Sequence, residues 1–483
     1  MASSAIVVGA GFGGIAAAIE LRRAGVAEIT VLERGADVGG VWQHNTYPGA
    51  ACDVPSHLYS YSFAPNPRWG RRFALQGEIR DYVRDAAARG GVLERVRCGV
   101  EAKRARWLED DGVWEVECSD ATRRAELLVT ACGQLSRPEI PRIAGIESFA
   151  GEAFHSSGWR HDLDLRGKRV GVIGTGASAI QFVPRIQSQV ASLTVVQRTA
   201  PWILPKLDRA YSPLAKRLFA SVPALQSAGR FGLWAALEVA IAGFVGHEAV
   251  LSPFAAVGRA HLRRQVPDAR LRELLTPRFT IGCKRILLSS DWYPTLTKPN
   301  VELVAQPIAC ADEHGIELAD GSRRELDVLI YGTGFSAHDF VAPMQVEGRD
   351  GQTLVHAWDG LPNAWHGLSV PGFPNLFLMY GPNTFGGSGS AIYVLESQAR
   401  HVAAAARAMQ SRRAHRIEVR ADAHERFLSE LRQRQRSTVW ATGGCTSWYL
   451  DEQGRDPTNW PGYTIEYRRR TSRIDPTVYE LAA

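Results

Sequence analysis

Short apolar runs alternate with helical patterns at the start of the chain. Residues Ala5 to Val8 form an apolar run that predicts a buried strand, and Gly13 to Ala24 repeats apolar positions at helical spacing. A second apolar run, Ile29 to Leu32, ends directly before Glu33. Strand, helix and strand in this order predict a βαβ unit, in which the two strands lie side by side and parallel.

The same pattern returns in the middle of the chain. An apolar run at Arg169 to Ile173 precedes a helical pattern from Ala177 towards Ile186, and another run follows at Leu193 to Gln197. A proline-containing stretch around Ser136 to Gly145 predicts a linker between the two units. Further buried strands are predicted at Leu127 to Thr130, Val301 to Val304, Ile316 to Leu318, Val328 to Tyr331 and Leu376 to Tyr380. The predicted fold is α/β, with two Rossmann-like dinucleotide-binding domains.

Residues 201–280 have a different character, because they are rich in Leu, Ala, Phe and Arg and show little strand pattern. We expect several helices here, inserted into the second nucleotide-binding domain. The first domain is expected to comprise residues 1–140 and 333–483, the latter with a mobile C-terminal loop and tail. The second domain is expected to comprise 141–200 and 281–332, with the helical insertion 201–280 between its two parts.

One stretch of the insertion, Gly232 to Gly246, is strongly apolar. It is shorter than the about 20 residues that a membrane span needs, and it carries Glu238. We expect a buried or tunnel-lining helix in this stretch. Shallow contact with a membrane is the alternative.

Composition narrows the class of protein. The chain of 483 residues has a net charge of +6 but no basic block long enough to indicate a nucleic-acid partner. Its seven cysteines are odd in number and contain no C-x-x-C pair. This indicates a reducing compartment, no disulfide framework and no metal site, and it argues against a flavin disulfide reductase. No secretory signal precedes the first strand, so we expect a cytoplasmic protein without a transmembrane segment.

Two glycine-rich turns, one in each βαβ unit, carry the first chemical signal. Glu33 and Arg198 follow these turns at the same spacing. An acid at this position suits a ribose with free hydroxyls, whereas a base suits a ribose that carries a phosphate. We therefore expect two different dinucleotides, the second being NADPH, and a redox enzyme. The turn residues expected to contact them are Gly9, Gly11, Phe12 and Gly14 in the first unit, and Gly174, Thr175, Gly176, Ala177, Ser178 and Ala179 in the second.

The segment between the two units is more specific. Its pattern Phe149-x-Gly151-x-x-x-His155-x-x-x-Trp159 resembles the fingerprint of the Baeyer–Villiger monooxygenases. The related flavin-containing monooxygenases usually carry another aromatic residue where this chain has Trp159. Further segments that resemble the family are Gly39 to Trp42, Tyr47 to Gly49, Cys52-Asp53, Ser56 to Tyr59, Gly282 to Arg285, Asp327 to Phe335 and Gly443 to Gly462. Two positions depart from the family pattern: Arg160 replaces the usual Pro or Asp, and Gly332 replaces the usual Ala.

The resemblance implies tightly bound FAD, NADPH as reductant, and O2 that forms a peroxide at the flavin C4a carbon, which converts a ketone to an ester or lactone. It also implies Arg285 as the catalytic cation, oriented by Asp53; arginine suits this role because it stays charged. The Leu, Phe and Trp content of the insertion and tail weakly indicates a small apolar ketone.

Further cofactor contacts follow from the resemblance and from the turn spacing. Lys284 and Arg198, with Thr199, are expected at the NADPH 2′-phosphate. Trp448 either closes over the nicotinamide or belongs to the core. His155 and Trp159 are expected to couple domain movement to NADPH binding rather than to make bonds. The remaining expected contacts are Glu33, Arg34, Gly40, Val41, Trp42, Asp53, Tyr59, Val100 and Asn383.

Two other functions share these motifs. A heteroatom oxygenase that forms N- or S-oxides would use the same cofactors, but it would not need an anion-stabilising arginine beside the substrate. A non-catalytic NADPH-sensing flavoprotein would need neither Arg285 nor Asp53. The presence of both residues therefore favours ketone oxygenation.

Overall fold

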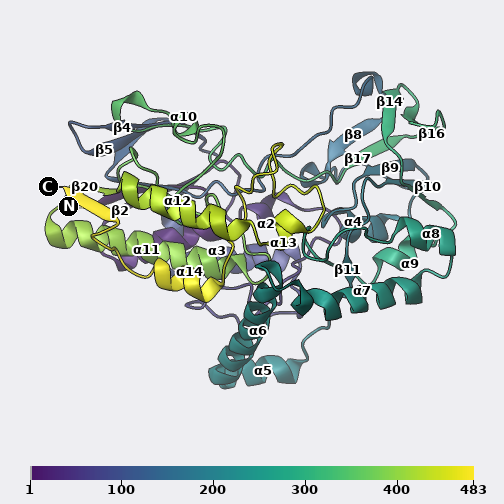
Figure 1. Cartoon of the computed structure of the whole chain (residues 1–483), viewed down its shortest axis with the longest axis horizontal. Coiled ribbons are helices and arrows are strands. Elements are labelled where there is room, and N and C mark those ends of the chain that lie inside the picture. Colours follow the sequence, from purple (N-terminus) through teal and green to yellow (C-terminus); the bar gives the residue numbers. More distant parts are fainter. Residues whose placement is uncertain (1–2, 483) are drawn as a thin grey trace.

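The computed structural model describes residues 3–482 and has two lobes joined below by a helical region (Figure 1). The core of the first lobe is a parallel sheet with strand order β19-β7-β1-β2-β3. Its strands are β1 Ser4–Val8, β2 Glu28–Glu33, β3 Val96–Cys98, β7 Leu127–Thr130 and β19 Leu376–Leu378. Because β19 pairs with β7, the chain returns to the first sheet after crossing the second lobe.

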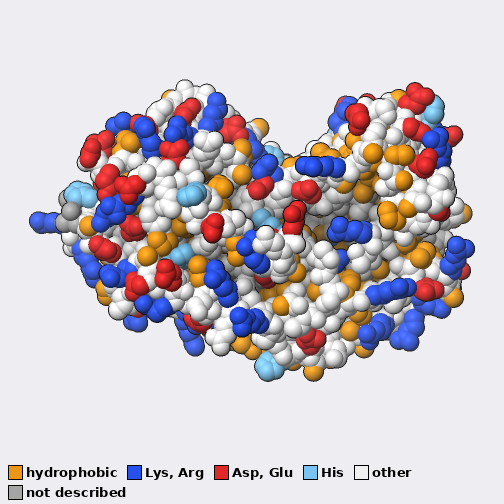
Figure 2. Space-filling model, turned by 45° about the horizontal axis from the view of Figure 1, so that its top comes forward, with side chains coloured by type: hydrophobic (Ala, Val, Ile, Leu, Met, Phe, Trp, Pro, Cys, Tyr) orange, Lys and Arg blue, Asp and Glu red, His pale blue; other side chains and the backbone are white. Residues whose placement is uncertain are grey.

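The second lobe contains a parallel sheet with strand order β13-β10-β9-β17-β8. Its strands are β8 Glu152–His155, β9 Arg169–Ile173, β10 Ser192–Val196, β13 Val301–Val304 and β17 Val328–Tyr331. Between β13 and β17 in the sequence, three strands form a separate antiparallel sheet: β14 Ile308–Asp312, β15 Gly315–Leu318 and β16 Arg323–Glu325. The two parallel sheets confirm the predicted α/β fold class. Between the lobes the surface is hollowed (Figure 2).

The first lobe also holds a sheet that the apolar pattern does not predict. Its order is β18-β4-β5-β6, with β4 Ala102–Leu108, β5 Val113–Cys118, β6 Thr122–Ala125 and β18 Gln345–Glu347. One face buries Trp114 and Val116, while alternate positions carry exposed charged side chains. Such alternation is the pattern of a sheet that faces water on one side.

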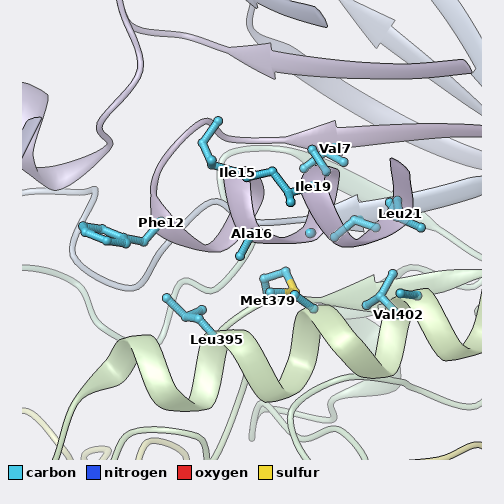
Figure 3. Packing of buried hydrophobic residues seen from close by; sticks show 14 of the residues in the cluster. Val7, Phe12, Ile15, Ala16, Ile19, Leu21, Met379, Leu395 and Val402 are labelled. Atoms are coloured by element: carbon cyan, nitrogen blue, oxygen red, sulfur yellow. The ribbon is translucent and has the colours of Figure 1, made fainter. Parts of the chain in front are cut away.

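The first glycine turn leads into α1 Phe12–Arg23, which packs along α11 Ala391–Arg412. Figure 3 shows Leu395 and Val402 of α11 pointing toward α1, with Met379 between them. The helices approach closely because α1 carries small residues on this side; a Cβ added to Gly13 would lie 3.2 Å from Leu395. The other helices of this lobe are α2 Val41–His44, α3 Gln76–Arg89, α10 Leu354–Ala357, α12 Ala421–Gln435, α13 Val439–Thr442 and α14 Thr464–Arg470, and β20 Arg416–Val419 pairs with β21 Tyr479–Ala482.

The second lobe has one helix after its glycine turn, α4 Ala179–Ile186. The predicted helical region contains α5 Pro213–Ser221, α6 Pro223–Phe244, α7 Ser252–Gln265 and α8 Ala269–Leu274, followed by α9 Trp292–Leu296, and β11 Ile203–Leu204 pairs with β12 Leu287–Leu288. Ile241 and Phe244 at the end of α6 are buried, whereas Phe231 and Val239 are exposed. Among the described residues, no helix is long and apolar enough to cross a membrane.

The expectation that the cysteines form no disulfide is wrong. Cys283 and Cys445, which are 162 positions apart, form a disulfide, which an odd number of cysteines does not exclude. Cys283 is fully buried beside Phe244 and Trp440, and the other five cysteines are free. Within residues 3–482, no group of His, Cys, Asp and Glu side chains could hold a metal ion.

Candidate active site

The first glycine turn has no room for side chains at its glycine positions. Gly9 has φ +103°, and a Cβ there would lie 2.4 Å from the Ala131 carbonyl oxygen. A Cβ on Gly14 would lie 1.8 Å from the Gly9 carbonyl oxygen. Helix α1 begins at Phe12 without a side-chain cap and without an acid in its first turn, so its N–H groups are free to bind phosphate. The turn therefore fits the pyrophosphate of a dinucleotide.

Glu33 is held at the end of β2 by two backbone amides. Ala10 N donates to Oε2 at 2.8 Å and Gly35 N donates to Oε1 at 2.7 Å. The Val100 amide donates to the Glu33 carbonyl at 3.0 Å, which places Val100 beside it. Each carboxylate oxygen keeps a lone pair for a ribose hydroxyl. Arg34 points instead towards Glu101, 3.7 Å away, and is half exposed.

An aromatic group surrounds the first turn. Phe12 lies edge-on to Tyr59 with ring centres 5.2 Å apart, and Trp42 Nε1 donates to the Tyr59 hydroxyl at 3.1 Å. Gly40 precedes α2 with φ +57°, and a Cβ there would lie 2.9 Å from the Gly11 Cα. The structure thus brings this group of predicted cofactor contacts together, with Val41 as the first residue of α2.

The second glycine turn repeats this geometry. Gly174 has φ +105°, and a Cβ there would lie 2.4 Å from the Gly332 carbonyl oxygen. Helix α4 has no side-chain cap and no acid in its first turn. Gly332, a departure from the family pattern, lies directly under this turn, where a Cβ would meet Ala179 at 3.3 Å. Both turns fit a bound dinucleotide.

A basic pocket opens past the end of β10. Its volume is about 360 Å³, and its lining brings together Arg198, Thr199 and Lys284, which the sequence assigns to the 2′-phosphate, and also Arg278. Lys284 Nζ donates to Thr199 Oγ1 at 3.1 Å. Burial, and then the charge of Arg198, lower the pKa of Lys284. Three cations around one cavity, of which Arg278 also lies 3.7 Å from Glu273, indicate a site for an anion such as a ribose phosphate.

Sequence reasoning missed Arg278, which comes from the loop after α8 rather than from the second βαβ unit. No local sequence pattern marks Arg278, because its position in the pocket depends on how the helical insertion packs against the second nucleotide-binding domain. Cys445 also lines the pocket, and its disulfide to Cys283 fixes this part of the lining to the Lys284 segment.

Arg285 and Asp53 form a two-pronged ion pair between the lobes. Arg285 Nε donates to Asp53 Oδ2 at 2.9 Å, and Nη2 donates to Oδ1 at 2.8 Å. Protein surrounds the guanidinium on most sides, yet 32% of the Arg285 side chain is accessible. Burial by itself lowers the pKa of Arg285, but Asp53, with smaller contributions from Tyr449 and Tyr380, raises it above its usual value. The arginine therefore stays charged and keeps one fixed orientation.

The elements around this pair explain its position. Asp53 follows a loop that docks on α4, since Tyr47 donates to Gln181 Oε1 at 3.1 Å and Gln181 Nε2 donates to the Ala51 carbonyl at 3.0 Å. Arg285 lies just before β12, at 5.6 Å from the centre of the Phe385 ring. The first and second domains thus meet at this ion pair.

The fingerprint residues lie apart from it. His155 ends β8, bonds Ser157 Oγ through Nδ1 at 2.8 Å and contacts the Phe335 ring. Trp159 packs against Phe182 of α4 at 5.2 Å. Arg160 is on the surface and pairs with Asp162 and Glu152. These contacts join the interdomain segment to the second sheet and its helix, rather than to the ion pair.

Two tail positions differ in their surroundings. Trp448 is 37% exposed and packs against Phe385 at 5.5 Å, whereas Trp440 and Trp460 are buried in the core. Asn383 is buried, and its side-chain amide donates to the Asp456 carbonyl at 2.7 Å. The tail loop is therefore anchored at Asn383 while Trp448 stands at the edge of the site.

Comparisons with known proteins agree with this geometry. Residues 7–74 match the family model described as NAD(P)-binding Rossmann-like domain. A Baeyer–Villiger monooxygenase of Streptomyces coelicolor is 44% identical over 98% of this chain and 92% of its own. Another, from Pseudomonas aeruginosa, is 43% identical over 98% of this chain and 90% of its own. The crystal structure of OTEMO in complex with FAD and NADP superimposes with a TM-score of 0.88, at 29% identity, covering 100% of this chain and 99% of that one.

These matches extend over the whole chain rather than over the glycine turns alone. They confirm the predicted cofactors, FAD and NADPH, and the predicted oxygen-inserting chemistry. The chain belongs to the Baeyer–Villiger monooxygenases, the FAD-dependent enzymes that use NADPH and O2 to convert ketones to esters or lactones.

Proposed function

We propose that Arg285, oriented by Asp53, binds the carbonyl oxygen of a ketone and stabilises the negative charge that develops there during oxygen insertion. The observation that carries the proposal is the two-pronged ion pair, with its guanidinium accessible between the lobes. FAD, reduced by NADPH, supplies the activated oxygen. A fixed cation that needs no rearrangement during the reaction is an effective stabiliser of such charge.

We also propose which residues hold the cofactors. The turn at Gly9 and the carboxylate of Glu33 would hold the FAD pyrophosphate and ribose, with the aromatic group around Phe12 beside them. The turn at Gly174 would hold the NADPH pyrophosphate, and the basic pocket with Arg198 would hold its 2′-phosphate.

The surroundings of Arg285 favour an apolar ketone as the substrate. Phe385, Tyr449 and Trp448 pack together beside the guanidinium, so a substrate would meet aromatic surface around one charged group. An apolar pocket with few polar groups selects apolar ligands.

We further propose that the enzyme works in the cytoplasm, where NADPH is regenerated.

The test separates reduction from oxygenation. In Arg285→Ala, NADPH should still bleach the bound flavin at a near-normal rate, while ketone conversion should fall by about 10²–10³-fold. Arg160→Ala, which removes an exposed arginine of the same lobe, is the matched control and should convert ketone normally. Normal ester formation by Arg285→Ala would overturn the proposal. Retained sulfide oxidation in that variant would show that Arg285 acts on the ketone carbonyl specifically.

A further inference from the structure

Helices α5 and α6 form a hairpin that projects from the molecule (Figure 1). Several large apolar side chains on this hairpin are exposed. The exposed fractions are 67% for Leu214, 45% for Leu218, 50% for Leu225, 64% for Phe231 and 67% for Val239. Single exposed apolar side chains are common on protein surfaces, but a run of them along one hairpin marks an interaction site.

The orientation of the hairpin is fixed by its other face. Trp234 stacks on Tyr393 with ring centres 5.7 Å apart, and its Nε1 donates to Thr464 Oγ1 at 3.1 Å. Glu238 accepts from the Ile465 amide at 2.8 Å. Arg230 donates to the carbonyl oxygens of His57, Leu58 and Ser60. The polar side chains of α6 are therefore used against the body of the protein, and the apolar face is held outward.

Apart from Glu238, which is bonded to the body of the protein, the charged side chains of this hairpin are all cations. Between Arg209 and Leu237 the sequence contains no aspartate or glutamate. In α5, Arg217 is exposed and Lys216 is half-exposed, and neither has an ion-pair partner among residues 3–482. An apolar face bordered by unpaired cations is complementary to an anionic lipid surface. It is unfavourable for symmetric pairing with a second copy, because Lys216 and Arg217 of both copies would then lie near each other.

We propose that the α5–α6 hairpin binds the surface of a bilayer that contains anionic phospholipid, with Leu214, Leu218 and Phe231 entering the interface. The inner side of the same hairpin reaches the segment that follows Asp53. Phe219 lies edge-on to His57 with ring centres 4.6 Å apart, and Gln226 Nε2 contacts His57 Nδ1 at 3.0 Å. The hairpin therefore connects the lipid surface to the chain segment that carries the ion pair, which suits an enzyme whose substrates partition into lipid.

The test is flotation of the FAD-loaded enzyme with two kinds of vesicle, phosphatidylcholine alone and phosphatidylcholine containing phosphatidylglycerol. We expect binding to the anionic vesicles that weakens as salt rises, and weaker binding to the neutral ones. Lys216→Gln with Arg217→Gln should reduce the partition coefficient on the order of 30-fold, because each cation contributes about fivefold. Leu218→Ser with Phe231→Ser should reduce it by at least about tenfold.

Matched controls lie on other surfaces. Val355→Ser removes an apolar side chain that is 71% exposed on α10, and Arg412→Gln with Arg413→Gln removes two adjacent exposed cations at the end of α11; all should bind as the wild type does. Binding to neither vesicle, or equal binding by the hairpin variants, would overturn the proposal. A dimer in sedimentation that Leu218→Ser with Phe231→Ser dissociates would also overturn it, since a second copy would then cover this face.

Discussion

Removal of Arg198 should change the choice between NADPH and NADH. Arg198 borders the basic pocket with Thr199, Lys284 and Arg278. The NADPH 2′-phosphate would enter this pocket, whereas NADH has only a hydroxyl at that position. A charge-assisted hydrogen bond contributes about 1.5–3 kcal/mol. Arg198→Ala should therefore raise the KM for NADPH by about 10–100-fold and leave the KM for NADH nearly unchanged.

Alanine substitution of the other two cations of the pocket should raise the KM for NADPH less than Arg198→Ala does. Lys284 is partly buried, and one of its hydrogen bonds already goes to Thr199, so we expect about a tenfold effect for Lys284→Ala. The Arg278 side chain is 81% exposed and lies 3.7 Å from Glu273, so solvent screens it and we expect a change of only a few fold.

Initial rates of NADPH and NADH oxidation, measured with the same ketone, give the ratio directly. Isothermal titration with NADP+ checks that the change lies in binding rather than in turnover. Arg264→Ala, at an exposed site near the end of α7, is the control and should leave both KM values unchanged. Equal increases for NADPH and NADH in Arg198→Ala would refute the assignment of this pocket to the phosphate.

Three further changes test other parts of the structure. Cys283→Ser with Cys445→Ser should lower the free energy of unfolding by about 2–5 kcal/mol, because the disulfide closes a long loop; free thiols at both Cys283 and Cys445 in the wild type, found by mass spectrometry, would contradict the pairing. Burial lowers the pKa of His401 to about 4, so its contribution to stability is present above about pH 6.5 and is lost as the pH falls towards 4. His401→Gln should remove up to about 3 kcal/mol of that pH dependence in urea melts, and an unchanged slope would exclude this origin. Gly14→Ala places a Cβ against backbone and should abolish FAD retention, whereas Gly77→Ala, with open space around it, should keep the yellow colour; flavin retained by Gly14→Ala would refute the fit of the first turn.

The parallel strands were predictable because they are buried on both faces. Leu127–Thr130 and Val328–Tyr331 have the bounds that their apolar runs predict, since a fully buried strand is a continuous apolar run. The sheet of β4, β5 and β6 was missed because its strands alternate buried with charged residues such as Arg104 and Glu117, and no continuous apolar run marks them.

The site was predictable where a motif fixes local geometry. Glu33 and Arg198 follow glycine turns at set spacing, and the structure places Glu33 at the end of β2 and Arg198 just past the end of β10. The contacts of Arg278 and the pairing of Cys283 with Cys445 depend on how distant segments fold together, and no local pattern encodes that. The Arg285–Asp53 pair joins residues far apart in the chain, and only the family resemblance indicated it.

The most direct test of the account is the fate of labelled oxygen. Purified FAD-loaded enzyme is supplied with NADPH, ¹⁸O2 and an apolar ketone, and the products are identified by mass spectrometry. The account predicts an ester or lactone that carries one ¹⁸O atom for each NADPH oxidised, and loss of this product but not of flavin reduction in Arg285→Ala. NADPH oxidation that yields only hydrogen peroxide with every ketone offered, or labelled ester from Arg285→Ala at the wild-type rate, would contradict it.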